Sequence, residues 1–303
     1  MLIQLIGSLQ LGLLYAAMAM GVYVTFRILD IADLTVDGSF VTGMASTAVV
    51  TIVTSNPVLG ILAGVIAGGL AGLITGLLLT KVNVPPILAG IITMTGLYSV
   101  NMFIMGEKSN VALIGHETIF TYVCKVSPLN DEIDKLILSF LIILVVAVVL
   151  TIFFKTRPGM AIRATGDNEE MVKSSSINAD VSKCLGLVIA NACVGLSGAL
   201  ICQYQMFSDV GYGTGMVVIG LASIIIGETV AGRKAGVGVG ILSACIGSVV
   251  YRIMIAIALR FEIFPSYALK IISAVIVALS IAIPTVKNAL VNAKVKAQRR
   301  KEQ

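Results

Sequence analysis

Apolar residues gather into nine long runs along the chain, and polar residues do not alternate with apolar ones inside them. Each run is close to the roughly 20 residues that a helix needs to cross about 30 Å of hydrocarbon. A strand of a membrane barrel would be about ten residues long with every second side chain polar, so the runs predict helices. They cover residues 2–26, 38–54, 58–80, 85–105, 136–154, 184–204, 213–230, 236–259 and 265–286.

Composition agrees with this pattern. Hydrophobic residues make up 57% of the 303 residues and charged residues 12%, whereas about 25% of a soluble domain is charged. The mean hydropathy is +1.01, and only Glu228, Arg252 and Lys270 bring charge into the runs. We therefore expect an all-α, polytopic transmembrane helical bundle, and we exclude a soluble globular protein, a disordered chain and a coiled coil.

Lysine and arginine collect in alternate loops, and this asymmetry sets the expected orientation. With the N-terminus outside and the C-terminus inside the cell, 15 of the 21 basic residues face the cytoplasm. We predict nine spans, N-out and C-in, in one domain over residues 1–286, followed by a basic cytoplasmic tail at 287–303. That tail would face anionic lipid headgroups and not nucleic acid. The second and seventh runs are short, which leaves open whether they are full spans.

No set of side chains suits catalysis or metal binding. His116 stands alone as the chain's histidine, and the five cysteines include no C-x-x-C pair. No G-x-x-x-x-G-K-[ST] loop occurs, since the nearest match, residues 227–232, is followed by Arg233. We expect no catalytic residue, no metal site and no cofactor in this chain.

Glycine recurs at every fourth residue of the third run, which leaves one face of that helix without side chains. Such a stripe lets another helix approach to backbone contact. The glycines predict close packing without chemistry: Gly60, Gly64, Gly68, Gly72 and Gly76, with a second stripe at Gly232, Gly236 and Gly240.

Three carboxylates lie between the first two runs, where they are too costly to face lipid. Asp30, Asp33 and Asp37 are three and four residues apart, so a helix would put them on one face. Asp37, followed by glycine and serine, also suits the cap of a new helix. Both interpretations interrupt the helix. They leave open a cytoplasmic turn in which Asp30 neutralises Arg27, or a broken helix that lines a polar pathway.

The loop at 155–183 predicts a short helix with defined ends, and such a helix would suit docking of a cytoplasmic partner. The alternative is an interfacial loop helix. Met171 would be an exposed apolar side chain on this predicted helix. Its ends depend on several polar residues: Asp167 or Asn168 as the cap, Glu169 and Glu170 in the first turn, and Asn178 in a left-handed C-terminal position.

Arg252 lies deep in the eighth run, where its charge needs an acidic partner. Counting residues across the neighbouring turn leaves Glu228 roughly 20 Å away along the axis, while Asp209 is level within about 8 Å. Arg252 therefore pairs with Asp209 or meets a substrate carboxylate. Lys270 lies near the end of its run, where its stem can snorkel to the interface.

Four segments resemble the permease subunits of ABC importers of the branched-chain amino acid and ribose type, and most closely those of tryptophan or tyrosine transporters. These segments are residues 12–40, 85–106, 157–171 and 268–284. The resemblance implies a type II ABC importer permease, a homodimer in the bacterial inner membrane. It also implies a separate ATPase that holds ATP and magnesium, and an external binding protein that delivers an amino acid, with an aromatic one favoured.

The resemblance further implies that the loop helix is a coupling helix seated in the ATPase. Its coupling residues would be Asp167, Asn168, Glu169, Glu170, Met171 and Ile177. We assign to the translocation pathway Asp33, Thr35, Asp37, Ser39, Thr93, Thr95 and Arg252. Two other functions stay open. An ion-coupled secondary transporter would need carboxylates at mid-membrane, where Glu228 does not lie, and a channel would need no coupling helix.

Overall fold

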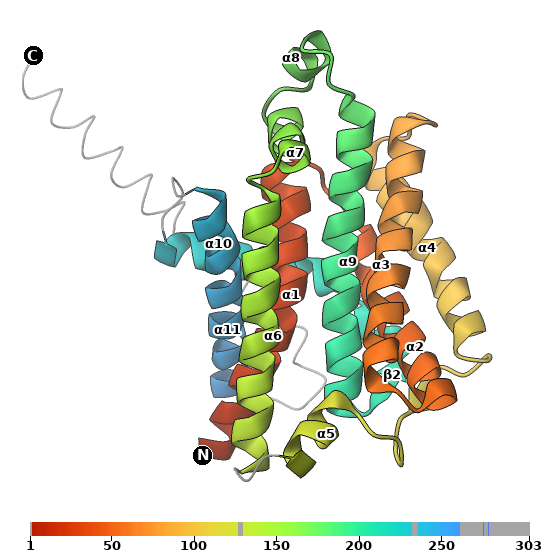
Figure 1. The fold of residues 1–303 in the computed structure, drawn as a ribbon, viewed down its shortest axis with the longest axis vertical. Helices are drawn as coiled ribbons and strands as arrows, with labels where there is room; N and C mark the ends of the chain where they lie inside the picture. The colour runs from red at the N-terminus through yellow and green to blue at the C-terminus, as the bar shows by residue number, and fades with distance from the viewer. Residues whose placement is uncertain (1, 127–129, 232–235, 261–274, 276–277, 279–303) are drawn as a thin grey trace, which may run out of the picture.

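In a computed structural model, long helices stand side by side and form one bundle (Figure 1). The structure describes residues 2–126, 130–231, 236–260, 275 and 278. The long helices are α1 (Leu2–Tyr23), α2 (Thr35–Thr54), α3 (Pro57–Thr80), α4 (Pro86–Ile104), α6 (Asp131–Phe153), α9 (Ala179–Gln205), α10 (Met216–Ala231) and α11 (Val237–Arg260). The shorter elements are α5 (Ile119–Val126), α7 (Arg157–Asp167), α8 (Glu169–Ser174) and the strands β1 (Asn110–Ala112) and β2 (Phe207–Asp209).

Eight described segments are long and apolar enough to cross a membrane, and they coincide with the first eight predicted runs. The all-α, multi-span bundle is therefore confirmed. The ninth run at 265–286, with Lys270, and the tail at 287–303 lie outside the described residues, so nine spans stay a prediction.

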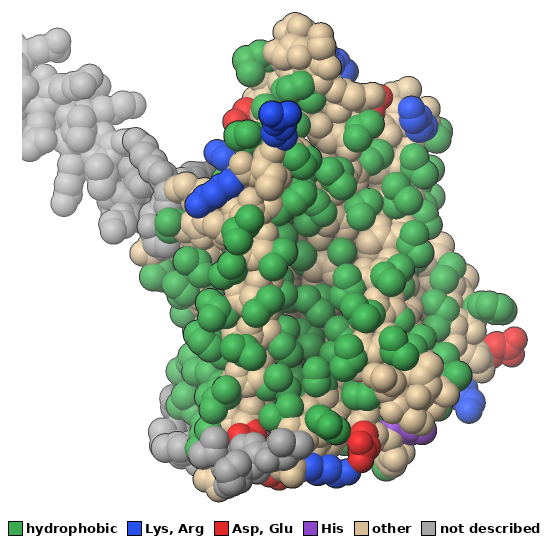
Figure 2. Space-filling model, in the orientation of Figure 1, with side chains coloured by type: hydrophobic (Ala, Val, Ile, Leu, Met, Phe, Trp, Pro, Cys, Tyr) green, Lys and Arg blue, Asp and Glu red, His purple; other side chains and the backbone are tan. Residues whose placement is uncertain are grey.

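The two ends of the bundle differ. The N-terminus and α5 lie at one end, here called the α5 end, and α7 and α8 stand at the other, the α8 end (Figure 1). Between them, the face drawn in Figure 2 is a broad belt of hydrophobic side chains, with charged side chains above and below it. This is the surface expected of a protein that crosses hydrocarbon.

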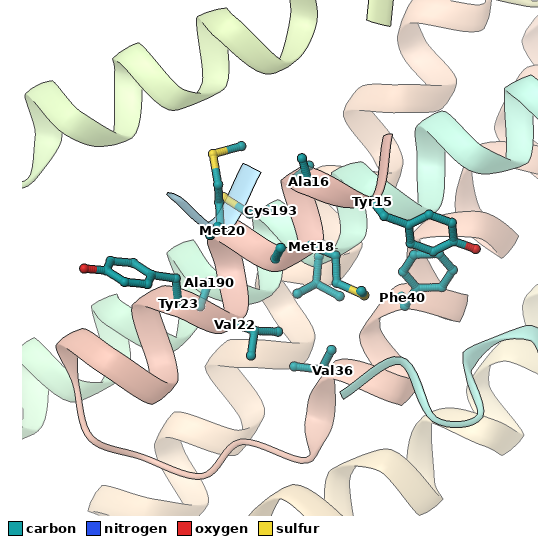
Figure 3. Packing of buried hydrophobic residues seen from close by; sticks show 14 of the residues in the cluster. Tyr15, Ala16, Met18, Met20, Val22, Tyr23, Val36, Phe40, Ala190 and Cys193 are labelled. Atoms are coloured by element: carbon teal, nitrogen blue, oxygen red, sulfur yellow. The ribbon is translucent and has the colours of Figure 1, made fainter. Parts of the chain in front are cut away.

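Helix α1 forms the centre of the core. Its residues from Leu14 to Met20 are almost completely buried, and a helix that is apolar on all sides belongs inside a bundle. Figure 3 shows α1 side chains packed against α2 and α9, with the ring of Tyr15 against the ring of Phe40. The rings are nearly parallel, and their centroids are 6.0 Å apart.

The glycine stripe of α3 packs against α2 and α9, as the spacing predicts. A Cβ atom on Gly68 would lie 2.5 Å from the carbonyl oxygen of Asn191 and 2.8 Å from the Cα atom of Gly195. One on Gly72 would overlap the carbonyl oxygen of Leu187. Hydrogen in place of a side chain therefore allows backbone contact between α3 and α9.

The structure supports close packing at only part of the second stripe, Gly232, Gly236 and Gly240. A side chain at Gly240 would collide with the ring of Tyr23, which confirms close packing there. A Cβ atom on Gly236 would have no described atom within 4 Å, so close packing is not found at that position. Gly232 lies outside the described residues.

Regular helix stops at two places that matter for the site, after α1 and before α10. After α1 the chain makes one π-helical turn, Val24–Ile28, and then runs without helix through residues 29–34 before α2 begins. Helix α10 has 16 residues, and a 3-10 turn, Val210–Gly213, precedes it. Together they form the segment Val210–Val230 that is long enough to cross a membrane. Helix α10 therefore begins inside the seventh run, and the helical break predicted after the first run is confirmed.

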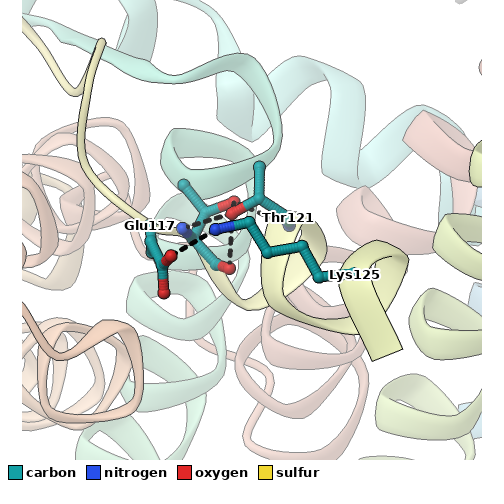
Figure 4. A network of polar contacts seen from close by, with 4 residues as sticks. Glu117, Thr121 and Lys125 are labelled. Carbon is teal, nitrogen blue, oxygen red and sulfur yellow. Dashed lines mark hydrogen bonds and ion pairs between the residues drawn. The ribbon is translucent and has the colours of Figure 1, made fainter. Parts of the chain in front are cut away.

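Polar contacts hold the connections at the α5 end. Strands β1 and β2 pair antiparallel, with Val111 opposite Ser208. At the start of α5, Glu117 forms an ion pair with Lys125, and Thr121 exchanges hydrogen bonds with Thr118 (Figure 4). The strand pairing joins the segment between α4 and α6 to the chain after α9, and the other contacts stabilise α5 locally.

We predict that methyl groups added to the α3 stripe destabilise the bundle. Gly68→Ala and Gly72→Ala should each lower the free energy of unfolding by about 1–3 kcal/mol, because backbone atoms must move apart. Gly69→Ala is the matched control on the same helix, since its Cβ would have no neighbour closer than 3.6 Å. Thermal unfolding of the purified protein in detergent measures all three. Equal melting temperatures would contradict the packing.

Candidate functional site

A buried polar network surrounds the break between α1 and α2. The Asp33 carboxylate accepts hydrogen bonds from the backbone N–H of Thr35 (2.8 Å) and from Asn191 Nδ2 (2.7 Å). The Ser39 hydroxyl donates to Asn191 Oδ1 at 2.6 Å. Asp33 is 6% exposed, and Ser39 and Asn191 are fully buried. Asp33 therefore supplies an acceptor to a backbone N–H at the start of α2, and Asn191 and Ser39 hold that carboxylate in place.

A row of threonine hydroxyls extends this network toward α4. Thr35 Oγ1 lies 2.7 Å from Thr75 Oγ1 on α3, and Thr75 donates to Thr93 Oγ1 on α4 at 3.0 Å. Thr93 in turn donates to the carbonyl oxygen of Ala89. Polar side chains from α2, α3, α4 and α9 thus meet inside an apolar bundle.

The three carboxylates do not share a helical face, so that prediction is wrong. Asp30 is exposed and left-handed, with φ at 55°, in the non-helical segment. Asp33 turns inward to Asn191, whereas Asp37 turns to another helix. The reason is the break itself, because the 3.6-residue period holds only in continuous helix.

Asp37 caps α10 and not its own helix. Its carboxylate oxygens accept from the backbone N–H of Gly215 (2.9 Å) and of Val217 (2.8 Å). These donors stand at the N-terminus of α10, where a negative charge is favourable. The start of α10 therefore lies close to the break between α1 and α2.

A cavity of about 220 Å³ opens beside Asp37. Helix α4 supplies Thr95, Tyr98 and Asn101 to its wall, and the turn before α10 supplies Gly213 and Thr214. Thr95 is exposed, and its hydroxyl donates to its own helix at Ile91. The predicted pathway residues thus fall into separate places. Asp33, Thr35, Ser39 and Thr93 are in the buried network, and Asp37 and Thr95 are at the cavity.

Arg252 does not pair with Asp209, contrary to one of the two alternatives. Its guanidinium carbon lies 3.7 Å from the ring centre of Tyr15, a cation–π contact. Asp209 accepts from Gly211 N–H and from Asn110 Nδ2. The axial count failed because α9 ends at Gln205, and Met206 turns the chain in a left-handed conformation.

An aromatic and amide cluster surrounds the Arg252 contact. The rings of Tyr15, Phe40 and Tyr212 lie nearly parallel in a row, and Gln205 Nε2 donates to the Tyr212 hydroxyl at 2.7 Å. Within the described part of the chain, Arg252 Nε and Gln205 Oε1 are buried without a hydrogen-bond partner. Such atoms are costly unless another polar group meets them.

Arg27 pairs with Glu228 and not with Asp30, which corrects the predicted neutralisation of Arg27. The π turn after α1 places Arg27 beside the last turns of α10. The two side chains are 27% and 17% exposed. Helix α10 is therefore fixed near both ends, by Asp37 at its start and by Arg27 near its finish.

The loop at the α8 end contains two helices where one was predicted. Asn168 caps α8 by accepting from Met171 N–H at 3.0 Å, as one predicted alternative has it. Asn178 does not end α8. It caps α9 by accepting from Asp180 N–H, and Ser176 takes the left-handed conformation instead.

Helix α8 presents an apolar side chain to solvent on a fixed base. Val172 is buried, while Met171 is 56% exposed. Glu169 forms ion pairs with Lys173 (2.9 Å) and Lys183 (2.6 Å), and these hold the pKa of Glu169 below its usual range. The pairs are therefore present at neutral pH and are lost only as the pH falls through that lowered pKa.

Several residues of the network were missed from sequence. Asn191 and Thr75 lie in predicted spans. Tyr15 contacts Arg252, Tyr212 contacts Tyr15, and Gln205 contacts Tyr212. A polar side chain inside an apolar run was the available signal for Asn191 and Thr75. Among the described residues, no group of three His, Cys, Asp or Glu side chains is placed to hold a metal ion.

Comparisons with known proteins agree with one another. A family model described as the permease component of branched-chain amino acid transport systems matches residues 4–280. A tyrosine transport system permease protein of Clostridioides difficile (strain R20291) is 35% identical over 266 residues, 88% of this chain and 86% of that protein. An uncharacterized protein of Rickettsia prowazekii (strain Madrid E) is 31% identical, over 75% of this chain and 77% of its own.

One solved structure shares the fold. PsaBC from Streptococcus pneumoniae in complex with Fab matches with a TM-score of 0.54 at 13% identity. The match covers 91% of this chain and 89% of that chain. At this sequence identity, the match shows that the two chains share an arrangement of helices and no more.

The contact between Arg252 and Tyr15 predicts which residue couples to Arg252. In a double-mutant cycle, Arg252→Gln and Tyr15→Leu should couple by about 1–2 kcal/mol, the range of a partly desolvated cation–π contact. Arg252→Gln and Asp209→Asn should be additive within about 0.5 kcal/mol. Unfolding of the purified protein in mixed micelles gives both values. A larger coupling with Asp209 than with Tyr15 would refute the assignment.

Proposed function

The chain belongs to the family of permease components of branched-chain amino acid transport systems, and from this premise we propose how its parts divide the work of transport. It is the membrane subunit of an ABC importer for an amino acid, in the bacterial inner membrane. The tyrosine permease relative favours an aromatic amino acid. The proposals that follow concern its partners and its pathway.

The observation that carries the pathway is that two helices begin side by side inside the bundle. Helices α2 and α10 both begin there, around Asp33 and Asp37. Transporters place substrate sites where discontinuous helices end near mid-membrane. We assign the cavity beside Asp37 to the pathway, with Thr95, Tyr98 and Asn101 facing the solute.

Arg252 supplies the positive charge that an amino acid carboxylate requires. Its unpaired Nε and the row of aromatic rings beside it suit a solute with a carboxylate and a ring. The buried network of Asp33, Asn191 and Ser39 then stabilises the break and does not itself bind solute. This division follows from burial, because the network is closed while the cavity is open.

Helix α8 is the coupling helix that docks on a separate ATPase subunit, which binds and hydrolyses ATP with magnesium. Met171 would insert into the ATPase, with Glu170, Ile177 and the exposed Asp167 and Asn168 around it. Two contacts carry motion from α8 inward. Glu169 is tied to Lys183 at the start of α9. Gly166 packs on the carbonyl oxygen of Ile28, immediately before the break.

Two further partners are a substrate-binding protein outside the cell and a second copy of the chain. The α5 end faces outward and receives an external substrate-binding protein, in agreement with the basic residues at the α8 end. A second copy of the chain completes the pathway beside α4, where Tyr98 is 60% exposed and Phe103 84% exposed. An ion-coupled transporter or a channel would need neither the ATPase nor α8.

We predict that Met171→Asp uncouples transport. A buried unpaired charge at the contact should weaken association with the ATPase by about 2 kcal/mol or more, roughly thirtyfold. Co-purification, ATP hydrolysis stimulated by the loaded binding protein, and uptake of radiolabelled tyrosine into proteoliposomes should fall together.

Met160→Asp is the matched control, because Met160 is 50% exposed on α7, outside α8. It should leave all three activities near those of the unchanged protein. Uptake that survives Met171→Asp, or that proceeds without ATP, would favour an ion-coupled transporter or a channel. Equal loss in both variants would show that the contact is not confined to α8.

The orientation predicts which loop is reached from outside the cell. In a background without the five native cysteines, Ser109→Cys before β1 and Ser174→Cys in α8 stand at opposite ends, and both positions are exposed. An impermeant maleimide added to intact cells should label Ser109→Cys and should label Ser174→Cys only after lysis. Labelling of position 174 in intact cells would reverse the topology.

A further inference from the structure

A second cavity, of about 290 Å³, lies at the α8 end, far from the pathway. Helix α6 supplies Thr151, the residues after it supply Phe154 and Lys155, α7 supplies Arg163, and residues 236–239 form the rest of the wall. The membrane-crossing part of α6 ends at Phe153, and that of α11 begins at Val237. The cavity therefore lies at the level where lipid headgroups meet the protein.

The cavity is positively charged. Lys155 and Arg163 are exposed, and no Asp or Glu lines the cavity. Among the ion pairs that the structure describes, Arg27, Lys173 and Lys183 have acidic partners, but Lys155 and Arg163 do not. Two cations without partners, facing one hollow, suit an anion.

An apolar track runs from the cavity into the membrane. On α11, Val239 lines the cavity, and Leu242 and Ile246 follow on the same face, all three at least 46% exposed. On α6, Val148 and Leu144 lie on the face below Thr151 and are also exposed.

The two helices meet at the top of this track. A Cβ atom on Gly238 would lie 3.0 Å from Thr151 Cγ2, so α6 and α11 are in contact beside the cavity. The exposed apolar faces of both helices continue below that contact. Apolar side chains next to a cationic cavity suit a phosphate that carries acyl chains and not a free anion.

We propose that this cavity binds the phosphate headgroup of an anionic phospholipid, whose acyl chains lie along α6 and α11. Lys155 and Arg163 pair with the phosphate oxygens, and Val239, Leu242, Ile246, Val148 and Leu144 contact the chains. Because α7 leads into α8, the lipid also fixes the base of the segment that carries α8. The site is independent of the transported solute and does not rest on the proposed function.

The test is lipid retention by the purified permease. The protein is incubated in detergent with equal amounts of phosphatidylglycerol and phosphatidylcholine, and bound lipid is counted by native mass spectrometry. The unchanged protein should prefer phosphatidylglycerol, and Lys155→Gln with Arg163→Gln should reduce this preference by about tenfold or more.

A matched control removes equal charge from the same end. Lys81 and Arg157 are exposed and do not line the cavity, so Lys81→Gln with Arg157→Gln should keep the preference. The charge-conserving pair Lys155→Arg with Arg163→Lys should keep it too. Melting temperatures in phosphatidylcholine alone should agree among all variants, since none of these side chains is buried.

Three results would overturn the proposal. One is no preference in the unchanged protein. Another is equal loss in the two glutamine pairs, which would show a diffuse surface charge. The third concerns the melting temperature. If inorganic phosphate or glycerol phosphate raises it as much as phosphatidylglycerol does, the site is one for a free anion and not for a lipid.

Discussion

Backbone inside hydrocarbon must satisfy its own hydrogen bonds, and the architecture of this permease depends on that constraint. Helices meet it without help, so eight described segments cross as apolar helices. Where helix stops at residues 29–34 and again before α10, side chains must take over. Asp33 and Asp37 do so, one at each break, and this explains why carboxylates lie so deep in an apolar chain.

Close helix packing makes these breaks possible. The glycine face of α3 lets its backbone touch α9 at Asn191 and Gly195, and the side chain of the same Asn191 donates to Asp33 at 2.7 Å. Close packing and the buried hydrogen bonds therefore share one stretch of α9, where a carboxylate without donors would be costly.

The breaks also connect the two ends of the molecule. Helix α10 is capped by Asp37 and paired through Glu228 to Arg27, which lies on the π turn before the break. Helix α7 packs on that same turn through Gly166. Under the proposed coupling, a displacement of α8 by the ATPase would act through Gly166 and Ile28 on the segment that positions both Asp33 and α10.

The sequence by itself determined the class of fold, the first eight apolar spans, the helical break, the close face of α3 and the exposed Met171, because each depends on local composition or on a period along one helix. Its family resemblance also agreed with the comparisons. The partners of the buried charges were decided only by the tertiary structure. Arg27 and Asp37 contact α10, about two hundred residues away in the chain, and Arg252 lies on Tyr15. Counting residues along an axis assumes unbroken helices, and here the breaks decide which side chains meet.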